Sequence, residues 1–326
     1  MKLNVSCFLM PQVTDWRINM RIRTQELKRI ILNTAKQYTP RIILLYHNYL
    51  KRLGRIPNLR NPESFSDKLA WYILYYRDEK MRICTDKAAV RDYIDSLGMG
   101  DLLNECYGVY EHVEDIDWDS LPQRFVIKHT LSGENMGTIL VFDKSTMDLG
   151  SIKRRLHSWL SEPPIRRAIG GLWTFESQNP RIIIERLLIE SENDDLPDYK
   201  FFCFNGHVFC SYLIRNSTTK ADRHDGELGI FDRDFRLLPA SDADFNSITE
   251  QPEKPKNYDK MIEIAEKLSE PFPHVRVDLY NLDGKIIFGE LTFFSGTGPN
   301  KHVPESFDYE LGKPFILPKK NYVGII

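Results

Sequence analysis

The chain has 326 residues, of which 42% are hydrophobic and 28% are charged, and its formal net charge is −2 at pH 7. These values are typical of a globular protein with a large core, organised as one large domain or as two to three lobes. No apolar run approaches the roughly 18 residues that a membrane-spanning helix needs, which excludes the class of helical membrane proteins.

The cysteines and the first residues favour a cytoplasmic protein. The five cysteines are scattered and show no C-x-x-C spacing, which indicates reduced thiols and argues against a zinc site or a disulfide frame. The opening stretch MKLNVSCFLMPQVTDW has one lysine and a short apolar run that is broken by Pro11 and followed by Asp15. This pattern makes a poor signal peptide.

A basic segment forms the first part of the chain, and residues 1–60 are predicted to be a basic helical arm. Between Arg17 and Arg60 there are eleven Lys or Arg residues and a single acid, Glu26. An amphipathic arm of this kind suits peripheral contact with an anionic membrane surface, and it equally suits a helical cap whose basic side chains are solvated. Nucleic acid is not expected as a partner, since no recognition module accompanies the charge.

Beyond the arm, hydrophobic periodicity predicts two interleaved sets of helices and strands. The first set has helices at 64–77, 85–97 (from Thr85 to the stop at Gly98) and 151–160, and strands at 106–110, 124–128, 138–142 and 181–188. The second set has strands at 199–204, 207–214 and 228–231, a loop at 240–257, a helix at 258–268 and a hairpin at 275–296. We therefore expect two α+β lobes, at 61–188 and 189–326.

The stretch FVIKHTLSGENMGTILVF in the first set has the form strand, glycine-containing loop, strand. Lys128 ends the first strand, and Ser132, Gly133 and Gly137 allow a tight loop whose backbone amides can face phosphate oxygens. Lys87 lies in the first turn of a predicted helix, a position that favours anions. The plain alternative is a hairpin with a lysine at its mouth.

The stretch RIIIERLLIESENDDLPDYKFFCFNG joins the two sets. A strand with buried character ends in Glu185, the following acidic loop carries Glu190 and Glu192, and Lys200 opens the next strand. A strand edge followed by a solvated loop explains the same residues.

The closing hairpin, VRVDLYNLDGKIIFGELTFFSG, shows the period-two alternation of half-buried strands. If residues 282–284 form a three-residue loop, Arg276, Asp278, Glu290 and Thr292 share one face. Arg276 then faces Glu290, Asp278 faces a phenylalanine, and the two acids are diagonal neighbours that can bind one hard cation. A two-residue loop would put the acids on opposite faces unless a bulge restores the register. The alternative is a solvated ion pair between Arg276 and Glu290.

In this order these stretches resemble the ATP-grasp superfamily, and specifically the TupA-like family, named for the teichuronopeptide-biosynthesis protein TupA. The resemblance implies an α+β ATP-grasp fold, in which two lobes clasp ATP, with the helical arm before them. The matching phrases run from Asn61 to Phe294 and are NPESFSDKLAWYIL, TDKAAVRDYI, LPQRFVIKH, PRIIIERLL, DYKFFCFNG, AEKLSEPFPHVRVDLYN and KIIFGELTF.

The resemblance also implies roles for the candidate residues. Lysines would contact the phosphates of ATP, a strand end would hold adenine, Glu190 or Glu192 would take the ribose hydroxyls, and two carboxylates would bind Mg²⁺. Thr292 stands where many ATP-grasp enzymes have Asn. The implied residues are Lys87, Lys128, Ser132, Gly133, Gly137, Glu185, Arg186, Leu188, Glu192 and Lys200 for ATP, Asp278, Glu290 and Thr292 for Mg²⁺, and Lys200, Arg215 and Arg276 for catalysis.

The activity that the resemblance implies is an ATP- and Mg²⁺-dependent carboxylate–amine ligase acting through an acyl phosphate. The family points to bacterial surface polysaccharide assembly, such as capsule or other cell-envelope polymers, with a uronic acid or similar carboxylate and an amine as partners. Arg215, Arg223 and Arg276 are candidates for the carboxylate contact, because a guanidinium binds such groups bidentately. Substrate loops are expected at 222–226 and 296–304.

Three other functions stay open at this point. A glycosyltransferase is supported by Asp-x-Asp pairs at Asp115 to Asp117 and at Asp232 to Asp234, although such short matches arise easily by chance. A sugar kinase would use the same ATP site and leave the phosphate on its product. An ATP-binding scaffold recruited by the basic arm would bind nucleotide without turnover.

Overall fold

The computed structural model describes residues 40–132, 137–161, 173–176, 178–189, 194–218, 223–294 and 299–322. The chain divides into two compact units, Met1–Pro40 and Arg41–Ile326, and the described helices and sheets belong to the second. Most of the predicted basic arm lies outside the described residues. None of the described helices is long and apolar enough to cross a membrane.

Helices come first in this unit. The helix predicted at 64–77 is confirmed as α3, and the side chain of its N-cap residue, Ser64, accepts a hydrogen bond from the Asp67 amide. The four helices that precede the first sheet in the described chain are α2 (Arg41–Leu53), α3 (Phe65–Tyr75), α4 (Glu79–Thr85) and α5 (Ala89–Ser96).

The single helix predicted at 85–97 is wrong, because the structure has a break there. Asp86 ends α4, and its carboxylate accepts hydrogen bonds from the amides of Ala88 and Ala89 at the start of α5. Thr85 is therefore the last residue of one helix rather than the cap of the next. The predicted stop is confirmed at Gly98, which has a positive φ just after α5.

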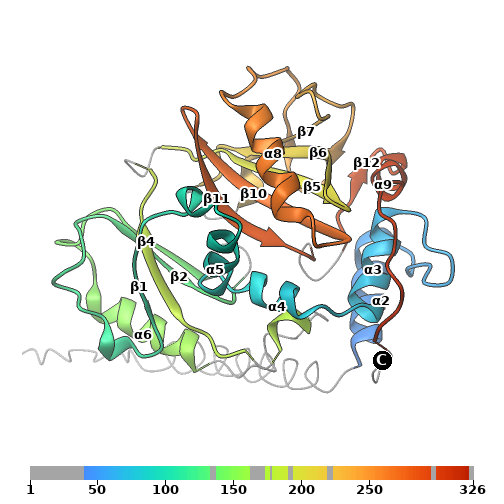
Figure 1. The fold of residues 1–326 in the computed structure, drawn as a ribbon. Helices are drawn as coiled ribbons and strands as arrows, with labels where there is room; N and C mark the ends of the chain where they lie inside the picture. The colour runs from blue at the N-terminus through green and yellow to red at the C-terminus, as the bar shows by residue number, and fades with distance from the viewer. Residues whose placement is uncertain are drawn as a thin grey trace, which may run out of the picture. The chain divides into compact units, whose positions relative to one another are not determined.

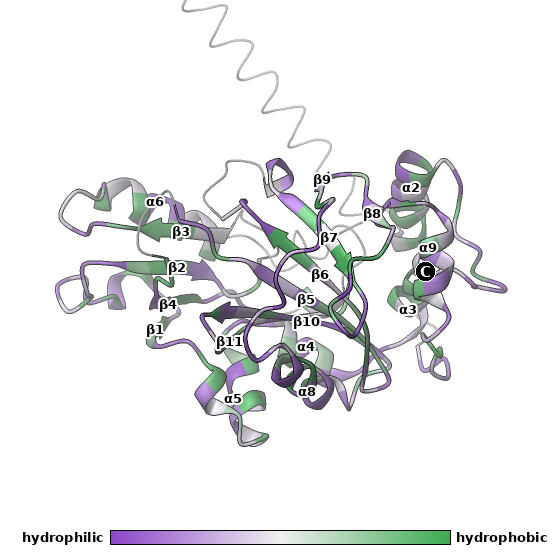
Figure 2. Ribbon diagram, turned by 90° about the horizontal axis from the view of Figure 1, so that it is seen from above, coloured by the Kyte–Doolittle hydropathy of each residue, from purple (hydrophilic) through white to green (hydrophobic). Residues whose placement is uncertain are grey.

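The first sheet is antiparallel, with the strand order β1-β4-β2-β3. Helix α6 (Leu149–Leu160) lies alongside it (Figure 2), and Leu156 packs in one core with Ile127 and Ile184. Alternation along the strands places Lys128 and Glu185 on the opposite face. The strands are β1 (Cys106–Tyr110), β2 (Phe125–His129), β3 (Thr138–Val141) and β4 (Ile182–Arg186).

The second sheet has the strand order β11-β10-β5-β6-β7-β9, and helix α8 (Tyr258–Ser269) covers one of its faces (Figure 1). The rings of Phe201 and Tyr258 lie 5.7 Å apart on that face. Five of these strands fall where strands or the hairpin were predicted, whereas β9 lies in the stretch 240–257 that was predicted to be a loop. They are β5 (Asp198–Phe204), β6 (His207–Arg215), β7 (Glu227–Phe231), β9 (Asn246–Ser247), β10 (His274–Leu282) and β11 (Lys285–Thr292).

Helix α3 covers one end of the other face of the second sheet. Phe65 of α3 meets the rings of Phe202 and Phe204 edge-on, each at 5.9 Å. The C-terminal helix α9 (Ser306–Gly312) is tied to α3, because the Asp308 carboxylate accepts hydrogen bonds from the amide and hydroxyl of Ser66. The remaining short elements are β8 (Ser241–Asp242), β12 (His302–Val303), η1 (Gly100–Leu102), η2 (Val113–Asp115), η4 (Trp173–Phe175) and η5 (Arg223–Asp225).

The largest core joins the N-terminal helices to the second sheet. Leu45 and Tyr49 of α2 are buried in the same cluster as Phe65 and the aromatic residues of β5. The predicted arm boundary at residue 60 therefore falls inside a packed region, and α2 to α5 pack with the second sheet rather than with the first.

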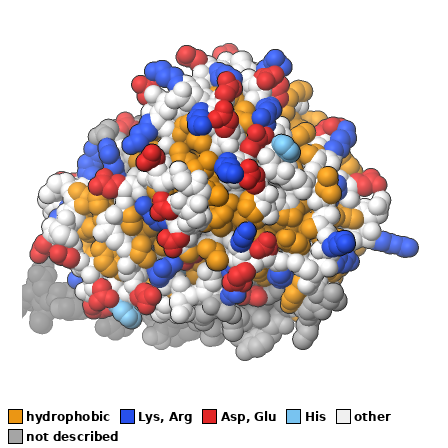
Figure 3. All heavy atoms as spheres, viewed as in Figure 1, with side chains coloured by type: hydrophobic (Ala, Val, Ile, Leu, Met, Phe, Trp, Pro, Cys, Tyr) orange, Lys and Arg blue, Asp and Glu red, His pale blue; other side chains and the backbone are white. Residues whose placement is uncertain are grey.

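On the surface, acidic and basic side chains are mixed with apolar ones over the face that Figure 3 shows.

Candidate functional site

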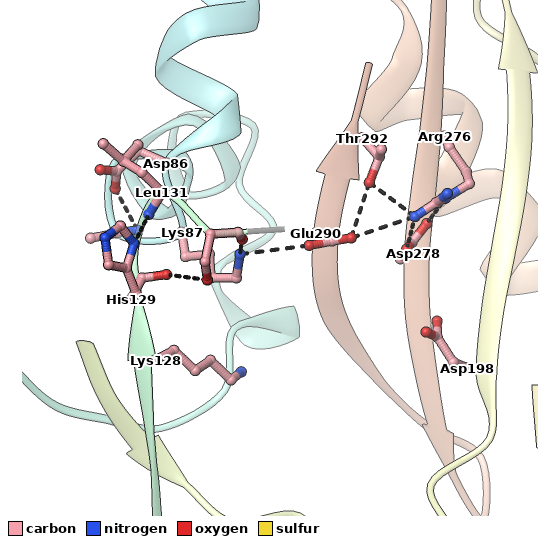
Figure 4. Close-up of polar contacts among 12 residues, drawn as sticks. Asp86, Lys87, Lys128, His129, Leu131, Asp198, Arg276, Asp278, Glu290 and Thr292 are labelled. Carbon is pink, nitrogen blue, oxygen red and sulfur yellow. Dashed lines mark hydrogen bonds and ion pairs between the residues drawn. The ribbon is translucent and has the colours of Figure 1, made fainter. Parts of the chain in front are cut away.

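A row of charged side chains crosses the second sheet on the face opposite α8. Lys200 on β5 pairs with Asp278 on β10, and Asp278 pairs with Glu290 on β11. Directly paired residues of an antiparallel sheet share a face, so the three side chains are neighbours. Arg276 and Thr292 form the next pair along, and Figure 4 shows their side chains together with those of the two acids. The predicted common face is confirmed.

The turn of this hairpin differs from the prediction. Leu282 pairs with Lys285, so the loop has two residues, Asp283 and Gly284, and the predicted three-residue loop is wrong. Both loop residues have positive φ, 51° and 97°, as a tight Asp-Gly hairpin turn requires.

A bulge corrects the effect of the short loop. On its own, a two-residue loop would put Asp278 and Glu290 on opposite faces, but the register shifts by one residue beside Asp278. Asp278 consequently faces Glu290 rather than Phe288, and Arg276 faces Thr292 rather than Glu290. The two acids are thus direct partners instead of the predicted diagonal neighbours.

Asp278 is buried between two cations. Nε and Nη2 of Arg276 donate to Oδ1 and Oδ2 of Asp278, each over 2.7 Å, and Nζ of Lys200 donates to the same Oδ2. Nζ of Lys200 also lies 2.6 Å from Asp198. Burial raises the pKa of Asp278, and the charges of Arg276 and Lys200 oppose that rise. The carboxylate is therefore held rigidly in an ion-pair network.

Glu290 is more exposed and is held more loosely. Its Oε1 accepts a hydrogen bond from the Thr292 hydroxyl over 3.0 Å and a long one of 3.4 Å from Arg276, and its Oε2 lies 3.8 Å from Nζ of Lys87. Burial alone would raise the pKa of Glu290, but Lys87, Lys200 and Arg276 lower it to about 2. The alternative Arg276–Glu290 ion pair exists, yet Arg276 binds Asp278 at a shorter distance.

Lys87 connects the two sheets. Its backbone amide donates to the carbonyl of Thr130 after β2, its Nζ donates to the carbonyl of Ser132, and the same Nζ faces Glu290 on β11. Burial lowers the pKa of Lys87, and the charge of Glu290 opposes that change. Lys87 and Glu290 lie far apart in sequence, and the ion pair brings a predicted phosphate-binding lysine to a predicted metal ligand.

Glu185 on β4 lies between two cations of its own. Its carboxylate binds Nζ of Lys128 over 2.7 Å and Nη1 of Arg91 over 3.0 Å. Arg91 is also hydrogen-bonded to the carbonyl of Asn104, and the Asn104 side chain donates to the carbonyl of Arg186. Sequence reasoning missed Arg91 and Asn104, although Arg91 stands with Lys87 in the quoted phrase TDKAAVRDYI.

Some of the main-chain groups predicted to contact adenine already have hydrogen-bond partners in this structure. The backbone amide of Arg186 donates to the carbonyl of Glu105, and its carbonyl accepts from Asn104, so the main chain of Arg186 is already engaged. Leu187 follows directly and packs with Val126 in a small apolar cluster, and Leu188 comes next in the chain. This apolar cluster lies beside Lys128 and Glu185, since Val126 shares their face of the sheet.

A small cavity of about 20 Å³ lies where the residues of both sheets meet, which is room for about one water molecule. A nucleotide is far larger than this cavity. The cavity is lined by Lys87, Arg91, Leu103, Asn104, Lys128, Glu185, Phe288 and Gly289.

Several predicted residues lie away from this cluster or outside the described residues. Arg215 pairs with Glu227 over 2.7 Å, and alternation along β6 places it on the α8 face, so the structure does not bring it to Lys200. Gly137 lies against Ser132, where any Cβ would clash with the hydroxyl, so this position requires glycine. The side chain of Arg223 and the whole of Gly133, Glu190 and Glu192 lie outside the described residues.

The two Asp-x-Asp pairs form turns. Asp232 accepts hydrogen bonds from the amides of Asp234 and Arg236, and Asp117 accepts them from the amides of Asp119 and Ser120. Carboxylates used in this way close their own loops. Within the described part of the chain, no group of three or more His, Cys, Asp or Glu side chains could hold a metal ion. Both Asp-x-Asp pairs therefore have a local structural explanation.

A protein-family model matches most of the chain. A model described as TupA-like ATP-grasp matches residues 67–316. No curated protein matches the chain in sequence.

Solved ligases are similar in structure at low sequence identity. D-alanine–D-alanine ligase from Bacillus anthracis is 18% identical, with 70% of this chain and 62% of that chain covered and a TM-score of 0.42. D-Alanine–D-alanine ligase from Helicobacter pylori is 11% identical, with 78% and 70% covered and a TM-score of 0.40. L-Amino acid ligase from Bacillus licheniformis is 14% identical, with 66% and 41% covered and a TM-score of 0.36. The chain thus spans less than two thirds of the first and third of these proteins.

Proposed function

Because the chain belongs to the TupA-like ATP-grasp family and has its α+β fold, we propose that it is an ATP-dependent carboxylate–amine ligase. The observation that carries the proposal is the contact of Lys87 with Glu290, which belongs to the row formed by Lys200, Asp278 and Glu290. Lys87 also lines one small cavity together with Lys128 and with Gly289, the residue before Glu290. A triphosphate needs such cations, and its metal needs such acids.

The lysines are suited to the phosphates of ATP. Lys87 and Lys128 would release Glu290 and Glu185 and bind phosphate oxygens, as flexible point charges can. Lys200 would reach the terminal phosphoryl group from the second sheet. The apolar cluster that contains Val126 and Leu187 would receive the adenine ring, with Glu185 or the main chain at Leu188 in contact with its edge. Glu192 would take the ribose hydroxyls.

The donor set fits Mg²⁺. Asp278 and Glu290 offer hard carboxylate oxygens on one face, Thr292 offers a weaker hydroxyl oxygen, and Mg²⁺ commonly takes one or two carboxylates plus substrate phosphates. When bound, Mg²⁺ would neutralise charge on the transferring phosphoryl group. Arg276 would keep Asp278 oriented through its Nε and Nη2 atoms.

The reaction follows from this arrangement of charges. The substrate carboxylate attacks the terminal phosphorus of ATP, the bond to the bridging oxygen breaks, and ADP and an acyl phosphate form. The amine then attacks the acyl carbon and displaces inorganic phosphate, which leaves an amide and releases a proton. In this proposal Lys200 and Arg276 would stabilise the negative charge that develops in both steps.

The substrates are proposed from the family association. A uronic acid or similar carboxylate of a bacterial surface polysaccharide would be the acyl donor, and an amino acid or other amine the acceptor, as in capsule or cell-envelope assembly. The reaction would take place in the cytoplasm, and the basic residues 1–60 would bring the protein to the inner face of the membrane through anionic lipids.

The test is product formation by the purified full-length chain. Incubation with Mg²⁺, ATP, a panel of acidic sugars and a panel of amines should release ADP and give an amide, identified by mass spectrometry as donor plus acceptor minus water. Lys128→Ala should weaken ATP binding at least about tenfold, whereas Lys285→Ala, at an exposed lysine on the far end of β11, should not.

Each other result speaks against the proposal. A product that retains phosphate would identify a sugar kinase, and nucleotide binding without turnover across the panels would support a scaffold. Equal ATP affinity of Lys128→Ala and the unchanged protein would refute the assigned nucleotide site.

A further inference from the structure

The spacing of Asp278 and Glu290 depends on one residue that carries no functional group. From the turn outward, the pairs run from Leu282 and Lys285 to Leu279 and Phe288 without interruption. The next regular pair would join Asp278 to Gly289 and send Glu290 to the face that α8 covers. The bulge therefore determines whether the two acids meet.

Gly289 is the extra residue of that bulge. A Cβ atom at this position would lie 2.9 Å from the carbonyl oxygen of Asp278 and 3.3 Å from the ring of Tyr280. The first of these atoms belongs to the backbone, so it cannot rotate away as the end of a side chain can. Any other residue would have to displace the main chain at Asp278.

Such a displacement acts directly on the charged row. Asp278 is held by Lys200 on one side and Arg276 on the other, and Glu290 faces Lys87 at 3.8 Å. Gly289 also lines the small cavity between the two sheets. A shift of the Asp278 backbone therefore changes the distance between the two carboxylates as well as the space in front of them.

We propose that Gly289 is a positioning residue, whose bulge sets the separation of the Asp278 and Glu290 carboxylates that the metal–nucleotide complex requires. This inference rests on the proposed function, because it assumes that the two acids bind a metal. It assigns no contact with substrate to Gly289 itself.

The experiment compares Gly289→Ala with Gly229→Ala. Gly229 is also a strand glycine, and an added Cβ there would also meet an atom closer than 3.0 Å, but the atom belongs to the side chain of Phe231 on the face of the sheet away from the row. Binding of Mn²⁺ with a non-hydrolysable ATP analogue is measured by calorimetry, and unfolding is measured in urea. Gly289→Ala should weaken Mn²⁺ binding about 10- to 100-fold per folded molecule, and Gly229→Ala should leave it unchanged.

A second measurement on the unchanged protein covers the case in which Gly289→Ala does not fold. Hydrogen exchange of the segment that contains Phe288 to Leu291 should slow when Mn²⁺ and the analogue are added, because the bulge lies directly before a ligand. Unchanged exchange there, or equal Mn²⁺ affinity of Gly289→Ala and the unchanged protein, would overturn the inference.

The outcomes also separate this inference from the proposed function. If the unchanged protein binds Mn²⁺ and nucleotide but forms no amide, the ligase proposal fails and the role of Gly289 can still be supported. If amide forms and Gly289→Ala binds Mn²⁺ normally, the ligase proposal stands and the role of Gly289 fails.

Discussion

The two sheets hold their charges in different ways. At the first sheet, Lys128 on β2 and Arg91 on helix α5 keep 24% and 20% of their side-chain surface exposed while they share Glu185 on β4. On the second sheet, Lys200 and Asp278 keep only 5% and 3% exposed and form a closed network. A partly exposed ion pair can open toward a ligand at small expense, whereas a buried one can be broken only at large cost. The charged side chains at the first sheet can therefore rearrange around a ligand, whereas those on the second sheet keep their positions.

Asp278→Asn should produce the largest loss of stability. It tests the contrast between the two sheets at the most buried of the charged side chains compared above. The change leaves Arg276 and Lys200 buried without a full counter-charge, so the free energy of unfolding should fall by about 3–5 kcal/mol. Urea denaturation measures this free energy of unfolding. The matched change on the first sheet, Glu185→Gln, should lower stability by no more than about 1–2 kcal/mol, because its cations can reach water. Equal losses would show that the two networks do not differ.

Acidification should weaken the second sheet through His274 on β10. Nδ1 of His274 donates to the carbonyl of Cys203 over 3.0 Å, and burial lowers its pKa to about 3. Below about pH 6.5 the unfolded chain binds a proton here that the folded chain does not, so the stability from neutral His274 is present above that pH and is lost as pH falls toward 3.

Below about pH 6.5 the free energy of unfolding should fall by about 1.4 kcal/mol per pH unit, which gives a loss of about 2.7 kcal/mol at pH 4.5. Urea denaturation between pH 7 and 4.5 measures it, with His274→Leu as the control, since the variant should lose the part of the slope that His274 contributes. An identical slope in both proteins would contradict the assignment.

Glu290→Gln tests the contact between the two sheets, because Glu290 on β11 faces Lys87, which is hydrogen-bonded to the chain after β2. Removal of its charge frees Lys87, so an ATP analogue without metal should bind severalfold more tightly than it does to the unchanged protein. The gain in affinity that Mg²⁺ gives should fall about tenfold, equivalent to about 1.4 kcal/mol. Calorimetry with and without Mg²⁺ measures both, and Glu263→Gln on the exposed side of α8 is the control. An unaltered Mg²⁺ effect would show that Glu290 is not a ligand.

Arg215→Ala should have the smallest effect. The sequence made Arg215 a catalytic candidate, but the structure pairs it with Glu227 away from Lys200. Loss of this half-exposed ion pair should lower stability by less than about 1 kcal/mol and leave the rate of ADP formation within about threefold. A hundredfold fall in that rate would return Arg215 to the site.

Local patterns in the sequence were enough for most of the elements and for the face of the hairpin. Alternation placed Glu290 with Thr292 and Arg276 with Asp278, because period two follows from strand geometry alone, and the predicted register put the two pairs on one face. The loop length was wrong because Asp283 can adopt a positive φ and so closes a two-residue turn with Gly284. A signal for the bulge was present, since an isolated glycine inside a strand often marks one.

Contacts between distant segments could not be predicted in the same way. The sequence gives no indication that Lys87 meets Glu290, or that Arg91 shares Glu185 with Lys128, because these pairs depend on how the two sheets pack. The break at Asp86 was missed for a related reason. Its carboxylate caps a new helix and also binds Arg181, and that second partner is supplied by the chain just before β4.

The pairing of every site cation with an acid has a consequence for kinetics. The ion-paired cluster contains five basic and four acidic side chains, so its net charge is close to zero despite its strong local fields. Long-range attraction of a polyanion depends on net charge, which means that ATP arrives without much electrostatic steering and that its association rate should change little with ionic strength. The cluster consists of Lys87, Arg91, Lys128, Lys200, Arg276, Glu185, Asp198, Asp278 and Glu290.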